Sequence, residues 1–148
     1  MNQPGAGAVP VELRAPFLVV RPEVSFWIER EGSSALRATL QAFREGCFDG
    51  AECIDERGWL WPVLDASLIT DPTLLDRVLP SKPLPVTVRF GSRRSIGVAE
   101  VVKRLVDVLR SGSEFSDHLD LPAPDLITRL EACGSITEVM GVVDAAGV

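Results

Sequence analysis

The stretch from Val86 to Gly112 constrains the fold more than any other part of this sequence. It opens with VTVRF, an alternating apolar and polar run typical of a half-buried strand. After a short turn, polar residues recur at spacings of three and four: Glu100, Lys103, Arg104, Asp107 and Arg110. Apolar residues fill the other positions, so the pattern predicts a mostly buried helix over 96–111. We expect Ser95 to cap this helix and Gly112 to end it.

The segments before this stretch predict several strands and two shorter helices. Residues 17–29 have the apolar alternation of one bent strand or of two short strands. The spacing of apolar residues predicts a helix over 34–45 that ends at Gly46. Two strands over 51–55 and 59–64 are expected to flank a turn, and Pro62 predicts an edge position or a bulge. A short helix is expected to open at Asp71-Pro72 and to close at Pro80.

The C-terminal part predicts a pair of helices. Residues 113–123 have no regular pattern, whereas 124–133 and 135–146 have helical periodicity with Gly134 between them. Ser135 and Glu138 match a capping box, and we expect the two helices to pack as a hairpin. The predicted fold is α+β: an antiparallel or mixed sheet of about four strands with helices on one face, plus the C-terminal helical hairpin. Residues 1–12 are interpreted as a flexible arm and 13–148 as a single domain.

Composition indicates a soluble protein. The N-terminus has no basic cluster followed by an apolar core, and no uncharged apolar run reaches the roughly 18 residues of a membrane span. The three cysteines have no CxxC spacing, so we expect reduced thiols and a cytoplasmic location. Thirteen of the fifteen basic residues are arginine, which suggests a bacterial source with a GC-rich genome.

The negative charge belongs to the C-terminal quarter. The chain has a net charge of −6, and residues 113–148 alone contain seven acids and one base, which also sum to −6. Such a surface repels nucleic acid and attracts a basic protein. The helical pair is therefore not interpreted as a DNA-binding helix-turn-helix, since its second helix has no Lys or Arg. We expect the acidic residues Asp117, Asp120 and Asp125 to steer a basic protein partner.

Trp59 and Trp61 are candidate partner-binding residues. On a strand they share one face, because side chains alternate with a period of two. If that face points inward, both are core residues. If it points outward, they form with Trp27 an aromatic platform of the kind that concentrates binding energy at protein interfaces.

The turn GSRRS at 91–95 is a second candidate site. A Gly/Ser turn that leads into a helix presents free N–H groups, and paired guanidinium groups bind phosphate or carboxylate. Ser92, Arg93, Arg94 and Ser95 are therefore the candidate residues of an anion-binding regulatory site. The spacing of nucleotide-binding glycine loops is absent, so a plain strand-to-helix turn is the competing interpretation.

The remaining polar clusters do not predict catalysis. His118 stands in the local sequence SDHLD, but neighbouring residues on a loop do not form a catalytic triad. Asp49, Glu52, Asp55 and Glu56 surround a predicted hairpin, where acids usually keep the edge soluble. No spacing of ligands indicates a metal or a cofactor. The function expected from the sequence is a non-enzymatic, acidic protein-binding module such as an immunity-type protein that neutralises a basic toxin, with anion binding at 91–95 as the alternative.

Overall fold

The computed structural model describes residues 13–30, 36–69, 71–78, 83–111 and 114–148. The predicted arm at 1–12, the expected helix stop at Pro80 and the expected helix end at Gly112 lie outside these ranges. Within them, the fold has the predicted α+β class, but the sheet contains seven strands instead of about four. No helix in these ranges has both the length and the apolar character needed to cross a membrane.

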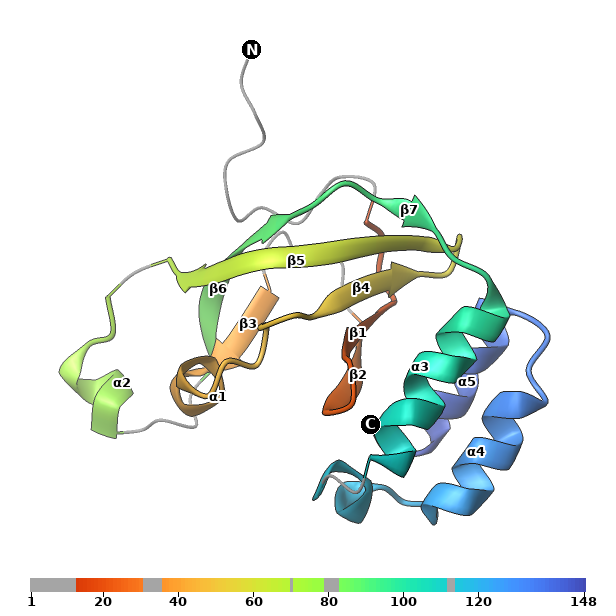
Figure 1. The fold of residues 1–148 in the computed structure, drawn as a ribbon. Coiled ribbons are helices and arrows are strands. Elements are labelled where there is room, and N and C mark those ends of the chain that lie inside the picture. The colour runs from red at the N-terminus through yellow and green to blue at the C-terminus, as the bar shows by residue number, and fades with distance from the viewer. Residues whose placement is uncertain (1–12, 31–35, 70, 79–82, 112–113) are drawn as a thin grey trace.

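The elements are arranged in a strand-rich N-terminal part and a helical C-terminal part (Figure 1). The strands are β1 (Phe17–Arg21), β2 (Ser25–Glu29), β3 (Leu36–Thr39), β4 (Glu52–Asp55), β5 (Trp59–Leu68), β6 (Pro83–Phe90) and β7 (Arg94–Ser95). The helices are α1 (Leu40–Arg44), α2 (Leu74–Val78), α3 (Val98–Arg110), α4 (Ala123–Glu131) and α5 (Ile136–Ala145), with a 3-10 turn η1 (Glu114–His118).

The sheet is antiparallel throughout and is organised on β5. Its order is β2-β1-β4-β5-β6-β3, and β7 also pairs with β5. The first half of β5 pairs with β4, and its second half pairs with β6 after a register shift between Val63 and Asp65. Figure 1 shows β5 running across the top of the curved sheet, with β6 and β3 at one end and β1 and β2 at the other. The predicted bulge beside Pro62 is confirmed, although this strand lies inside the sheet and not at its edge.

Alternation along the strands builds a core on each face of the sheet. On β1, Leu18 and Val20 face the helices, whereas Phe17 and Val19 face the other way, and all four are buried. The helix-side core adds Phe26, Ile28, Ile54 and Leu60 from the strands and twelve buried residues from 96 onward. The opposite core contains Leu13, Ala38, Phe48, Ala51, Cys53, Trp61, Val63, Val86 and Val88 in addition to Phe17 and Val19. A sheet covered on both faces explains why β1 is continuously apolar.

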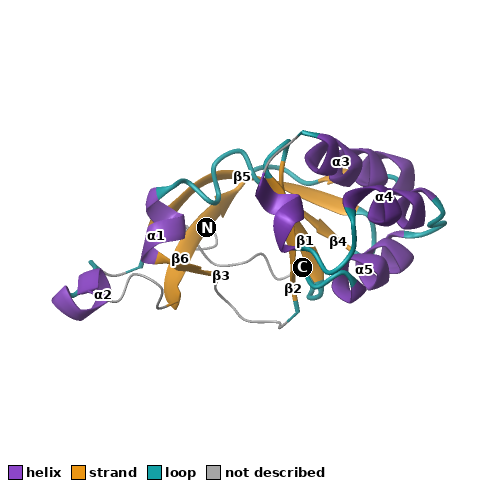
Figure 2. Cartoon of the chain, turned by 90° about the horizontal axis from the view of Figure 1, so that it is seen from below, coloured by secondary structure: helices purple, strands orange, loops and turns teal. Residues whose placement is uncertain are grey.

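The helices α3, α4 and α5 form one layer against β1, β2 and β4. Figure 2 shows these three helices gathered at one end of the molecule, with α1 and α2 at the other end. The polar stripe predicted for α3 is confirmed, since its buried side chains are Val101, Leu105, Val106, Val108 and Leu109. Contacts between α4 and α5 confirm the predicted helical hairpin. At its start, the Ser135 side chain accepts from the Glu138 N–H at 3.2 Å, as the capping box predicts.

Two predicted helix starts are wrong. Residues 36–39 form β3, which pairs with β6, and α1 begins only after the N-cap Thr39. The opportunity to pair with the edge of β6 therefore decides the structure of residues 36–39, although the spacing of their apolar residues favours a helix. Ser95 does not cap α3: it belongs to β7 and pairs with Trp59, so α3 begins after Gly97 without a side-chain cap. By contrast, Gly46 has a φ of 76° just after α1, as expected of the predicted stop.

Candidate functional site

The two tryptophans of β5 face the opposite core. Trp61 is only 8% exposed and Trp59 is half-buried, and Trp27 of β2 packs at the border of the same core. The hairpin turn before β5 sets the position of the two tryptophans on this strand. The buried carboxylate of Asp55 accepts hydrogen bonds from the N–H groups of Arg57 at 2.9 Å and of Trp59 at 3.2 Å. Trp61 is therefore a core residue, as expected if the shared face points inward, whereas the side chain of Trp59 stays partly exposed.

Arg93 lies over the ring of Trp59. Its guanidinium carbon lies 4.1 Å from the ring centroid of Trp59 and 5.5 Å from that of Trp61. A cation over the face of an aromatic ring is stabilised by about 0.5 to 1 kcal/mol at an exposed site. The Nε1 atom of Trp61 is buried and has no hydrogen-bond acceptor among the described residues. The turn at 91–95 and the tryptophan pair, which sequence reasoning treated as separate sites, thus meet in one cluster.

The two arginines of the turn point to different partners. Arg93 stacks on the tryptophans, whereas Arg94 forms an ion pair with Glu100 of α3, with 3.5 Å between Nη1 and Oε2. Ser92 is exposed and Ser95 is held in β7. Each guanidinium group of the turn therefore has its own neighbour, a pair of aromatic rings for Arg93 and a carboxylate for Arg94.

The three candidate acidic residues lie on the helical layer. Asp117 belongs to η1, Asp120 follows it, and Asp125 lies in the first turn of α4. All three are exposed, and no ion pair to them occurs within the described ranges. The backbone fixes their position, because the Asp120 N–H donates to the carbonyl of Ala146 at 3.0 Å. The structure does not bring them to Trp59 and Trp61, since the helices cover the other face of the sheet.

Several acids outside residues 114–148 form ion pairs with nearby bases, whereas Glu23, Asp49 and Glu56 form none with the described residues. The ion pairs are Asp55 with Arg57 and Glu52 with Arg104, both at 2.9 Å, Asp65 with Arg89 at 2.5 Å, and Asp107 with Lys103 at 2.9 Å. Among the side chains that the structure describes in residues 115–148, only that of Asp144 forms an ion pair, and its partner is Arg30. The excess negative charge predicted for the C-terminal quarter is therefore concentrated on one layer of the structure.

The remaining candidate groups are dispersed. Glu52 and Asp55 each have their own arginine, and Asp49 and Glu56 are exposed. His118 is exposed at the end of η1. Among the described residues, no three His, Cys, Asp or Glu side chains gather as metal ligands would.

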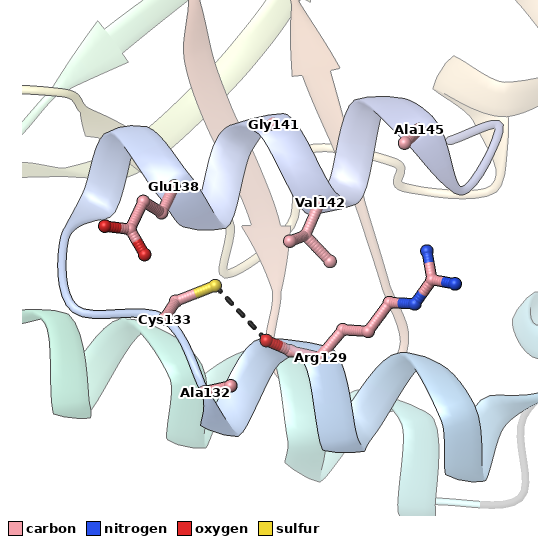
Figure 3. Close-up of a pocket in the computed structure, with 7 residues that line it drawn as sticks. All are labelled: Arg129, Ala132, Cys133, Glu138, Gly141, Val142 and Ala145. Carbon is pink, nitrogen blue, oxygen red and sulfur yellow. Dashed lines mark hydrogen bonds between the residues drawn. The ribbon is translucent and has the colours of Figure 1, made fainter.

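A groove between α4 and α5 was missed by sequence reasoning. It encloses about 490 Å³ and is lined by Arg129, Ala132, Cys133, Glu138, Gly141, Val142 and Ala145 (Figure 3). Burial raises the pKa of the Cys133 thiol, and the Sγ atom donates to the carbonyl oxygen of Arg129 at 3.3 Å. Figure 3 shows Arg129 and Glu138 at opposite ends of the groove. The signal in the sequence was the small residues at 132, 141 and 145, which are also compatible with plain helix packing.

No family model, no curated protein and no solved structure matches this chain.

Proposed function

We propose that this protein is a non-enzymatic protein-binding module whose acidic helical layer binds a basic protein. One observation carries the proposal: Asp117, Asp120 and Asp125 are exposed and form no ion pair with a described base, and they belong to the C-terminal quarter, whose charge of −6 equals that of the whole chain. Unpaired carboxylates on one layer produce a directed field that attracts a positively charged partner and raises its association rate.

The proposed partner is a protein and not a nucleic acid, because a phosphate backbone is repelled by the same charge. An immunity-type protein that neutralises a basic toxin belongs to this functional class. The alternative, anion binding at Arg93 and Arg94, receives less support from the geometry because each guanidinium already has a different neighbour. Thermal stabilisation by phosphate that is lost in an R93A/R94A double variant would favour the alternative.

A charge-matched comparison tests the proposal. The acid-layer variant carries Asp117→Asn, Asp120→Asn and Asp125→Asn. The control variant carries Glu23→Gln, Glu45→Gln and Glu56→Gln, which remove the same charge from exposed positions on the rest of the molecule. Each immobilised protein is used to capture partners from a lysate of its own source, and retained proteins are identified by mass spectrometry.

We expect a basic protein that is retained by the wild type and by the control variant but is lost with the acid-layer variant. Unfolding midpoints of both variants close to that of the wild type show that the loss is not caused by unfolding. Equal retention by all three proteins, or capture of acidic proteins alone, contradicts the proposed role of the acidic layer.

A further inference from the structure

The groove between α4 and α5 has an apolar lining of small side chains. Ala132 and Cys133 line it from the end of α4, and Gly141, Val142 and Ala145 line it from α5. Figure 3 shows Cys133 and Val142 pointing into the space between the two helices. A Cβ atom at Gly141 would project into open space. No described side chain fills this volume of about 490 Å³, so the groove can receive side chains from another molecule.

The two ends of the α4–α5 groove have opposite charges. Glu138 lies at one end and Arg129 at the other (Figure 3). Both side chains are exposed, and neither forms an ion pair with a described residue. The Gly134 N–H donates a hydrogen bond to Glu138 Oε2 at 3.1 Å, which holds this carboxylate at the edge of the groove. An occupant that complements the lining has an apolar middle, a cation near Glu138 and an acceptor group near Arg129.

The charges around the groove are mostly negative. The other charged residues of α4 and α5 are all exposed acids: Asp125, Glu131 and Asp144. Of these, only Asp144 forms an ion pair with a described residue, and its partner is Arg30. The Asp120 carboxylate lies beside Gly147, two residues after Ala145 of the groove. A second copy of this chain would place these acids opposite their own equivalents, so charge complementarity favours a basic occupant.

We propose that the α4–α5 groove receives an amphipathic helix of the basic partner. This inference rests on the proposed function and adds the place where the partner makes its apolar contacts. The ridge of side chains on one helix packs into the groove between two others, so the apolar face of the partner helix covers Ala132, Gly141 and Ala145.

The charges set the direction of the partner helix. Its lysine or arginine side chains lie beside Glu138, and its C-terminal carbonyl groups, which have a partial negative charge, lie toward Arg129. The surrounding acids raise the association rate, whereas the apolar contacts in the groove slow the dissociation.

A pair of leucine variants and a pair of synthetic peptides test the proposal. Gly141→Leu fills the groove, and Thr137→Leu is the control at an exposed position of α5 that does not line it. Leucine is favoured over glycine and threonine in a helix, so both variants should fold. The first peptide is an amphipathic helix of leucine and lysine. The second has the same composition in a scrambled order, so its charge is equal but it has no apolar face.

Isothermal titration calorimetry measures the Kd of each peptide. We expect the wild type and T137L to bind the amphipathic peptide about tenfold more tightly than the scrambled peptide, and G141L to lose this preference. Equal binding of the amphipathic peptide by G141L and the wild type overturns the groove as the docking site, as does a wild type without any preference. Sedimentation velocity that shows a wild-type dimer, lost in G141L, also overturns the proposal and assigns the groove to a second copy.

Failure of the proposed function has a different readout. In that case, the acid-layer variant would bind the scrambled peptide as tightly as the wild type does. Failure of the groove alone leaves the charge dependence in place and removes only the preference for the amphipathic peptide.

Discussion

Asp55 is the residue whose role differs most between sequence and structure. In the sequence it is one of four acids around a predicted hairpin, and in the structure its carboxylate is 1% exposed. Three hydrogen bonds hold it, two from backbone N–H groups and one from the Arg57 guanidinium at 2.9 Å. A buried carboxylate that is satisfied in this way fixes the turn before β5 and therefore the position of Trp59.

Replacing Asp55 by alanine should destabilise the fold. The N–H groups of Arg57 and Trp59 lose their acceptor in a partly buried turn, so we expect a loss of about 1 to 3 kcal/mol in the free energy of unfolding, measured in urea. Asp65→Ala is the control, because its ion pair with Arg89 is exposed and surface pairs contribute little. Equal losses in the two variants would show that Asp55 does not organise the turn.

Cys53 gives the stability a dependence on pH. Burial raises the pKa of its thiol well above the ordinary value, and Glu29 and Glu52 add to the shift. Above about pH 8.5 the unfolded chain loses this proton while the folded chain keeps it, so stability falls as the pH rises. Between pH 7 and pH 9.5 the wild type should lose about 1 kcal/mol more than Cys53→Ala, measured as the free energy of unfolding. Parallel curves for the two proteins across this range would be inconsistent with a buried, protonated thiol.

At the scale of elements, sequence patterns identified most of the structure but misplaced several boundaries. The hairpin before β5, the helices α2, α4 and α5, and the body of α3 follow from periodicity and from turn residues such as Gly58, whose φ is 86°. The errors occur where a distant strand supplies the partner. Residues 36–39 pair with β6 and Ser95 pairs with Trp59, and neither pairing leaves a signal in the local sequence.

The starts of α3 and α5 predict opposite effects of substitution. Ser135 caps α5 with a 3.2 Å hydrogen bond, so Ser135→Ala should cost about 1 kcal/mol. Gly97 precedes α3 in an extended conformation with a φ of −90°, and a Cβ atom there meets no neighbour. Gly97→Ser should therefore stabilise the protein by about a few tenths of a kcal/mol. Urea unfolding measures both changes, and a loss of stability in G97S would show that this position is not a free N-cap.

At the scale of the whole molecule, the chain separates its charge from its apolar surface. The charge asymmetry of the C-terminal quarter was visible in the sequence, and the structure places it on η1, α4, α5 and the segments that join them. The exposure of Leu74, Leu75 and Val78 on α2 was not foreseen, because a short run of hydrophobic residues at helical spacing is also what a core helix has. The contact between Arg93 and the tryptophans was missed for a similar reason, since it joins residues more than thirty positions apart.

The central claim is that the acidic layer steers a basic partner, and the association rate constant tests it most directly. Lowering the ionic strength from 0.15 M to 0.01 M lengthens the screening distance from about 8 Å to about 30 Å. For the basic protein retained in the capture experiment, stopped-flow kinetics should show a wild-type association rate that rises about tenfold or more over this range. The acid-layer variant should show a much shallower rise, whereas the control variant should stay close to the wild type. An association rate that does not depend on salt, or an identical dependence in the acid-layer variant, contradicts the account.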